Sequence, residues 1–360
     1  MKYPNLCVTI LILFLIPKST QGQKSLVDLM TMFSSSSKAT FINENHSSVS
    51  YVKIIDEEEK TDTTLVIDGE SIAFKILSTK KHEWNGLELK STTPLSNYKM
   101  IEIFEFDTKS NIIRSETLNS GSEGVEKLNE KMLFTYDDKN RLKHIRFIKE
   151  NMSVDKTVFQ AEYGDETLLP TNADIDLVLK MNIIQEPIKD GFKYIFKIEI
   201  PQDLIEMIKE ELGPNASDAE VKAALGPLGK VPKKYSNVTF AQDGSIKEEV
   251  YDENKENTEK MELTSVIYFD KNFNILNRTD YQDGQISSSN LYEYTDKQKV
   301  KSLQIGDGPK LINEFDAQGN MIKEYYEHGY YTRIYNNGRL SEEREYSNYS
   351  GLVGLTFYKY

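Results

Sequence analysis

Cysteine is almost absent from this chain of 360 residues, which has one, Cys7, inside an apolar run close to its start. We expect that run to be removed as part of a signal peptide, so the mature chain would contain no cysteine. This composition excludes disulfides, thiolate metal sites and a cysteine nucleophile. Because many small extracellular animal domains depend on disulfides, it also favours a bacterium that exports a protein with a sufficient hydrophobic core.

Basic charge is also scarce. The chain has 44 Lys and Arg against 57 Asp and Glu, a formal net charge of -13, and losing Lys2 and Lys18 with the signal peptide makes the mature chain more negative still. Nucleic acids and anionic membranes are bound through clustered Lys and Arg. No basic stripe offsets the acidic surface, so we expect neither of these partners.

Histidine is rare, and its spacing predicts no metal centre. The four histidines, His46, His82, His144 and His328, share no ligand motif. The sequence also lacks a Gly-x-Ser-x-Gly nucleophile elbow and a phosphate loop. Asp-rich turns such as the one at Asp137 could offer oxygen ligands to calcium, but a hairpin turn by itself explains Asp, Asn and Gly there. We therefore expect no metal and no cofactor.

Residues 1–22 have the pattern of a secretory signal peptide. Lys2 precedes an apolar run from Leu6 to Ile16, and Thr20-Gln21-Gly22 forms a small-x-small cleavage site. The run is shorter than the roughly 20 residues that a spanning helix needs, so no membrane insertion is expected after cleavage behind Gly22. The expected destination is secreted, periplasmic or cell-surface; the alternative is an uncleaved N-terminal anchor.

Aromatic residues are abundant and recur at a fixed distance before an apolar residue. The distance is six positions from Phe106 to Ile112, Tyr136 to Leu142, Phe240 to Ile246, Phe269 to Ile275, Tyr294 to Val300 and Phe315 to Met321. It is five positions from Tyr281 to Ile286, Tyr326 to Tyr331 and Tyr335 to Leu340. The shorter turns contain Asp283-Gly284, His328-Gly329 and Asn337-Gly338, and Asp-Gly and Asn-Gly are the strongest short hairpin signals. Side chains alternate between the turns, which predicts a curling antiparallel sheet.

Three of these turns carry a resemblance to a known family. The segments Phe315 to Glu324, Tyr136 to Leu142 and Phe269 to Ile275 resemble the tyrosine-aspartate (YD, or RHS-type) repeats of secreted and surface proteins of bacteria. Thr295 and Ala241 stand where other copies have Asp. The resemblance, which covers a third to a half of the mature chain, implies a β-hairpin repeat scaffold used for binding or encapsulation.

The predicted fold is mainly β, an antiparallel β-hairpin repeat sheet with a small helical-hairpin insertion. We expect an N-terminal β subdomain over 23–100, the first hairpin repeats over 101–165, an α+β insertion over 166–234 and a C-terminal hairpin repeat region over 235–360. Within the insertion, one helix follows Pro201 and ends at Gly213-Pro214, and a second begins at a Ser217-x-x-Glu220 capping box.

The candidate ligand-binding residues are Tyr326, His328, Tyr331 and Arg333, which fall in one predicted hairpin. Outward-facing tyrosines there would form an amphipathic platform for a sugar or a peptide, and inward-facing ones would be cross-strand packing. The sequence favours a secreted non-catalytic repeat protein that serves as a binding or surface-interaction scaffold, with a protein or glycan ligand. The alternatives are an exported hydrolase that uses two carboxylates and an accessory or neutralising partner of another exported protein, basic in charge.

Overall fold

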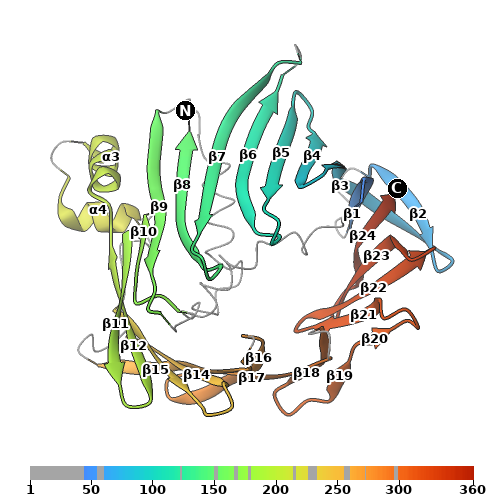
Figure 1. Ribbon diagram of the computed structural model, residues 1–360. Helices are drawn as coiled ribbons and strands as arrows, with labels where there is room; N and C mark the ends of the chain where they lie inside the picture. Colours follow the sequence, from blue (N-terminus) through green and yellow to red (C-terminus); the bar gives the residue numbers. More distant parts are fainter. Residues whose placement is uncertain are drawn as a thin grey trace. The chain divides into compact units, whose positions relative to one another are not determined.

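The computed structural model describes residues 44–54, 61–121, 124–149, 153–165, 169–176, 180–213, 216–225, 233–254, 260–271, 273–295 and 299–360. The expected signal peptide, residues 1–22, lies outside these residues. Nearly all of the regular structure is antiparallel β-strand (Figure 1), which confirms the predicted fold class.

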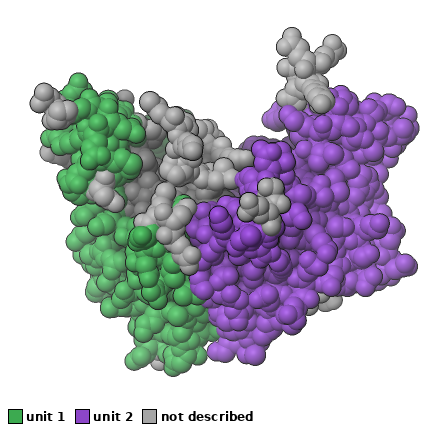
Figure 2. All heavy atoms as spheres, turned by 90° about the horizontal axis from the view of Figure 1, so that it is seen from above, with its two compact units in different colours: residues 1–36, 132–289 green, residues 37–131, 290–360 purple. Residues whose placement is uncertain are grey.

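The chain forms two compact units (Figure 2). Among the described residues, unit 1 comprises 132–289, and unit 2 comprises 44–131 together with 290–360. The chain passes from one unit to the other within β7 (Glu126–Tyr136) and within β17 (Gln285–Tyr294).

Unit 1 is a meander in which each strand pairs with the next along the chain. Its strands are β8 (Leu142–Lys149), β9 (Val154–Glu162), β10 (Asn172–Asp176), β11 (Lys180–Ile188), β12 (Gly191–Glu199), β13 (Lys234–Phe240), β14 (Ile246–Glu253), β15 (Met261–Phe269) and β16 (Ile275–Gln282). Period-two alternation is clearest in β14, where every second side chain is buried.

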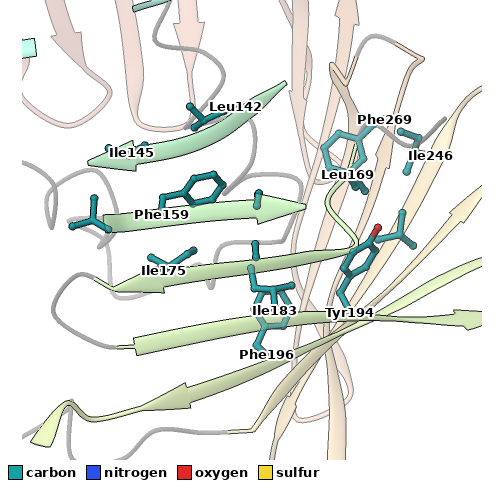
Figure 3. Packing of buried hydrophobic residues seen from close by; sticks show 14 of the residues in the cluster. Leu142, Ile145, Phe159, Leu169, Ile175, Ile183, Tyr194, Phe196, Ile246 and Phe269 are labelled. Atoms are coloured by element: carbon teal, nitrogen blue, oxygen red, sulfur yellow. The ribbon is translucent and has the colours of Figure 1, made fainter. Parts of the chain in front are cut away.

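One face of this meander is a continuous apolar core (Figure 3). Phe159, Ile183 and Tyr194 are each at most 1% exposed. The buried hydroxyl of Tyr194 has a hydrogen-bond partner, because Gln185 Nε2 donates to it at 2.7 Å. Burying such side chains stabilises the unit through the apolar area removed from water.

The predicted helical hairpin lies between β12 and β13 as α3 (Gln202–Leu212) and α4 (Asp218–Leu225). Gly213 ends α3 with a positive φ of 107°, which glycine adopts readily, and its N–H donates to the carbonyl of Lys209. The capping box forms as predicted: the Ser217 N–H donates to Glu220 Oε2 at 2.8 Å, and the Glu220 N–H donates to Ser217 Oγ at 3.3 Å.

Unit 2 combines strands from both ends of the described chain. They are β1 (His46–Lys53), β2 (Thr63–Ile67), β3 (Glu70–Asn85), β4 (Glu88–Pro94), β5 (Lys99–Phe106), β6 (Ile112–Ser120), β18 (Val300–Ile305), β19 (Lys310–Ile312), β20 (Glu314–Phe315), β21 (Met321–Tyr326), β22 (Gly329–Asn336), β23 (Arg339–Ser347) and β24 (Gly351–Lys359).

Strand β1 joins the two ends. One of its edges pairs with β24, in the register Ser50 opposite Thr356, and the other pairs with β3, in the register Ser50 opposite Ser78. β3 is long, continuing to Asn85, because β1 and β4 both pair with its second half.

Turns of one design follow the aromatic residues and explain the spacing of six. Between β5 and β6, the Asp107 N–H donates to the Asn111 carbonyl, and Ser110 adopts a φ of 71°. The Asp107 carboxylate accepts from the N–H groups of Lys109 and Asn111, at 2.8 and 2.9 Å, and from Asn111 Nδ2 at 2.8 Å. The carboxylate accepts in the same way at Asp137, Asp270 and Asp316, whereas Ala241 keeps the backbone bond alone. The aspartate of the repeat is therefore a turn cap.

We expect Asp107→Ala to lower the free energy of unfolding by about 1–2 kcal/mol, because the turn loses its carboxylate cap. Burial alone would raise the pKa of Asp107, but the hydrogen bonds from Asn111 and Lys109 hold it below its ordinary value. The stabilisation is therefore present above the unfolded-state pKa and is lost as the pH falls through the lower folded-state pKa. Urea denaturation at neutral and acidic pH checks this. Thr108→Ala, a change at an exposed neighbour, is the control, and an equal loss in both variants would contradict the assignment.

Candidate functional site

Three of the four predicted residues lie on one side of the C-terminal hairpins. In the register of β21, β22 and β23, Glu324 lies opposite Tyr331, Tyr331 opposite Glu345, and Arg333 opposite Glu343. Opposed residues of neighbouring strands point to the same side of a sheet. Tyr326, two residues beyond Glu324, points to that side as well.

These residues form a connected network. Arg333 donates from Nε to Glu343 Oε2 at 2.6 Å and from Nη2 to Glu324 Oε2 at 2.7 Å. The Tyr326 hydroxyl donates to Glu345 Oε1 at 3.1 Å, and its ring centroid lies 5.1 Å from that of Tyr331. Burial, followed by the charge of Glu345, raises the pKa of Tyr331 to about 12. Both tyrosines are half-buried, so their positions are fixed while part of each ring remains accessible.

His328 is not brought into this network. It lies in the exposed turn between β21 and β22, and its carbonyl accepts a hydrogen bond from the Asn348 N–H at 2.9 Å. The turn therefore has a structural role in holding the loop after β23.

Arg333 is the residue on which this network depends. Its side chain is 18% exposed and forms ion pairs with two carboxylates, those of Glu324 and Glu343. We expect Arg333→Leu to lower the free energy of unfolding by about 2 kcal/mol, because Glu324 and Glu343 would be left facing each other without a cation. Arg339→Leu is the matched control, since Arg339 also forms an ion pair but is 55% exposed; we expect a change of less than about 0.5 kcal/mol there. Urea denaturation measures the free energy of unfolding of both variants, and an equal decrease in Arg333→Leu and Arg339→Leu would argue against the network.

The opposite side of the same hairpins carries a second set of tyrosines. Tyr325 lies opposite Tyr330, and Tyr330 stacks on Tyr346 with centroids 4.8 Å apart. Lys323 Nζ lies 4.8 and 4.7 Å from the ring centroids of Tyr325 and Tyr330. Tyr346 packs against the small core around Phe74 and Leu355, so this side belongs to the packing of unit 2.

The side with Tyr326 and Tyr331 continues along the sheet into a pocket. The register runs from Glu343 to Thr356, from Thr356 to Ser50, and from Ser50 to Ser78. We call this surface the polar face; its residues across β21, β22, β23, β24, β1 and β3 are Glu324, Tyr326, Tyr331, Arg333, Glu343, Glu345, Thr356, Tyr358, His46, Ser48, Ser50, Ser78, Lys80 and His82.

The pocket has a volume of about 440 Å³ and an open mouth. It is lined by His46, Ser48, Ser50, Ser78, Lys80, His82, Leu89, Glu343, Thr356 and Tyr358. Glu343 therefore belongs both to the pocket and to the Arg333 network. Nearly all of the lining is polar, and a site of this size is typical for a small ligand.

Two histidines stack at one side of the pocket. The rings of His46 and His82 have centroids 4.4 Å apart and planes 19° apart. His46 Nδ1 lies 2.8 Å from the Glu44 carbonyl oxygen, which can only accept, so this nitrogen carries a proton. Burial, followed by the charges of His46 and Lys80, lowers the pKa of His82 to about 4. His82 is therefore neutral at pH 7.

Sequence reasoning missed the pocket. It treated the histidines as unrelated because His46 and His82 are far apart in the chain and share no motif. The signal that was available is the period-two pattern of β1 and β3. In β1, His46, Ser48 and Ser50 alternate with apolar Val49 and Tyr51, and in β3, Ser78, Lys80 and His82 occupy every second position. Only the register of β1 against β3 and β24 brings them together.

Within the described part of the chain, no group of three His, Cys, Asp or Glu is placed to hold a metal ion. The carboxylate oxygens of the Asp-rich turns, where calcium was considered, accept hydrogen bonds from their own turns, as at Asp137 and Asp316. Among the helices that the structure describes, none has the length and apolar character needed to cross a bilayer.

No protein-family model and no curated protein matches the chain. It is similar to a chain of the Photorhabdus luminescens Tc holotoxin pore at 11% identity, covering 79% of this chain and 16% of that one, with a TM-score of 0.24. It is similar to a porin-like protein from Bacteroides uniformis at 9% identity, covering 87% of this chain and 97% of that one, with a TM-score of 0.28. A TcdB2-TccC3 structure without the hypervariable C-terminal region gives 10% identity, coverage of 82% and 18%, and a TM-score of 0.20. The chain spans less than a fifth of each of the two toxin chains.

Proposed function

We propose that this chain is a secreted, non-catalytic β-hairpin repeat protein that binds a glycan on the polar face of unit 2. The observation that carries the proposal is the continuity of two partly accessible tyrosine rings with a hydroxyl-lined pocket on one side of the sheet. The hairpin spacing, which resembles YD and RHS-type repeats, supports a scaffold role. The pattern of residues 1–22 supports export.

The chemistry of the polar face suits a saccharide. An aromatic ring offers an apolar surface to the C–H groups of a sugar, and the tyrosine hydroxyl remains available to polar groups. The hydroxyls of Ser48, Ser78 and Tyr358 line the adjoining pocket and can each donate and accept hydrogen bonds. A polyhydroxylated ligand satisfies such groups better than an apolar one.

The carboxylates of the polar face are engaged in ion pairs and hydrogen bonds with neighbouring side chains, which is why we favour binding over hydrolysis. Glu324 and Glu343 pair with Arg333, and Glu345 accepts from Tyr326. Glu343 is the one carboxylate among the described residues that line the pocket. A glycosidase needs two carboxyl groups facing each other across the bound sugar.

The test is binding of the mature chain, from Gln23, to glycan and peptide arrays. We expect glycan binding, and we expect Tyr326→Ala/Tyr331→Ala to weaken it by about tenfold or more, because each aromatic contact contributes on the order of 1 kcal/mol. Tyr325→Ala/Tyr330→Ala is the matched control: it removes two tyrosines from the same strands but from the opposite side. Binding to peptides alone, no binding on either array, or an equal loss in both double variants would contradict the proposal. Release of shortened sugars would favour the hydrolase.

A further inference from the structure

The charged side chains around the pocket are more basic on one side than a neutral sugar would require. Three basic side chains, His46, Lys80 and His82, gather at one side of it. Lys80 forms no ion pair with any described residue, whereas its neighbour Lys81 pairs with Glu83 at 2.6 Å on the other side of β3. A half-buried lysine that no described carboxylate pairs with is unusual in a chain whose formal net charge is -13.

The acidic group of the pocket, Glu343, pairs with Arg333 and forms no ion pair with Lys80 within the described part of the chain. Glu343 receives Arg333 Nε at 2.6 Å, and the same Arg333 also binds Glu324. The remaining lining groups are mainly hydroxyls, and one pair of them is already bonded, with Thr356 Oγ1 donating to Ser50 Oγ at 3.0 Å. The pocket therefore offers one cation, Lys80, that no described carboxylate pairs with, beside a set of hydroxyls.

We propose that the pocket binds a saccharide that carries an anionic group, with Lys80 as the ion-pair partner of that group and the serine and tyrosine hydroxyls as partners of the sugar. This inference rests on the proposed glycan-binding function and specifies its ligand class. Such a ligand carries a negative charge on a polyhydroxylated ring. The charged group is a carboxylate, as in a uronic acid, or a phosphate.

The stacked histidines make the affinity of this site for an anion depend on pH. His82 faces His46 on β1, Lys80 on its own strand, and Tyr358 and Glu343 across β24 and β23. Burial and the two basic neighbours keep it neutral when the pocket holds no ligand. A bound anion offsets those charges and favours the protonated ring, so the complex takes up a proton. Affinity for the anion therefore rises as the pH falls through the bound-state pKa of His82, and it levels off below the ligand-free pKa.

The experiment is calorimetric titration of the mature chain with galactose, galacturonate, galactose phosphorylated on the same carbon, and inorganic phosphate. These sugars share one ring and differ in charge. We expect at least one charged sugar to bind about tenfold more tightly than galactose, as one partly buried ion pair allows. Lys80→Met should remove that advantage and Lys80→Arg should retain it. Lys81→Met is the control, since it changes the net charge equally on the other side of the strand.

Each outcome decides between the two levels of the proposal. Equal binding of galactose and the charged sugars, or equal behaviour of Lys80→Met and Lys81→Met, would overturn the anionic ligand and leave the glycan-binding function standing. Binding of inorganic phosphate as tightly as of the phosphorylated sugar would mean a simple anion site and would overturn the saccharide. The absence of binding by any sugar, together with silent glycan arrays, would overturn both. Proton uptake on binding, measured in buffers of different ionisation enthalpy, should disappear in His82→Gln if the histidine responds to the anion.

Discussion

Truncating Phe159 to alanine should lower the free energy of unfolding by about 3–5 kcal/mol, the largest loss that we expect from any single change in this chain. Phe159 is 1% exposed in the centre of β9, where its register partners are Ile145 and Ile175. It lies in the middle of the continuous core of unit 1 (Figure 3). Removing the ring leaves a cavity that neighbours on three strands cannot close without breaking their pairing.

Urea denaturation followed by far-ultraviolet circular dichroism measures this loss. Phe159→Leu should keep most of the stability, because it fills most of the same volume. Gln160→Ala changes the next residue along β9, which is exposed on the other side of the strand, and should cost less than about 0.5 kcal/mol. A loss below about 1 kcal/mol for Phe159→Ala would show that this face of unit 1 is not a packed core.

Gly329→Ala should be nearly as damaging, with a loss of about 3 kcal/mol. Gly329 begins β22 at a close approach to β23, and an added methyl group would collide with the Tyr346 carbonyl oxygen. The Tyr326 hydroxyl lies 2.8 Å from the position that this methyl group would take. The two strands would have to separate, and Tyr326 would lose its position beside Glu345. This substitution should therefore lower both stability and glycan binding.

The single tryptophan provides the probe for that measurement, since Trp84 lies on β3 of unit 2 and contacts Phe106. Urea denaturation followed by its fluorescence reports on the unit that contains Gly329. Gly121→Ala is the control, because nothing lies within 4 Å of the methyl group that it would add. Equal stability of the two variants would show that the register of β22 against β23 is wrong.

The local part of this fold was predictable because it depends on neighbours in sequence. A capping carboxylate such as Asp107 reaches N–H groups two and four residues further on, so the turn is visible in the spacing alone. The same holds for the capping box at Ser217, where the Ser217 N–H donates to Glu220 Oε2. Each of these features is decided by a few consecutive residues.

The pocket was not predictable, because it depends on pairings between distant strands. Ser50 meets Thr356 only through the pairing of β1 with β24, and no turn links those two strands. A shift of one residue in that register would send Ser48 and Ser50 to the other side of the sheet. The hairpin that contains Tyr326 and Tyr331 was visible in the sequence, but the hydroxyl-lined pocket beside it was not.

The most direct test of the central claim, that the pocket on the polar face is the ligand-binding site, is to follow the ring resonances of the four histidines by NMR during a galacturonate titration. His46 and His82 line the pocket. His144 lies in unit 1, where its Nε2 is 2.8 Å from Thr157 Oγ1, and His328 lies in the exposed turn. We predict that the resonances of His46 and His82 shift together and that those of His144 and His328 stay in place. Saturable binding that leaves His46 and His82 unchanged would contradict this assignment of the site.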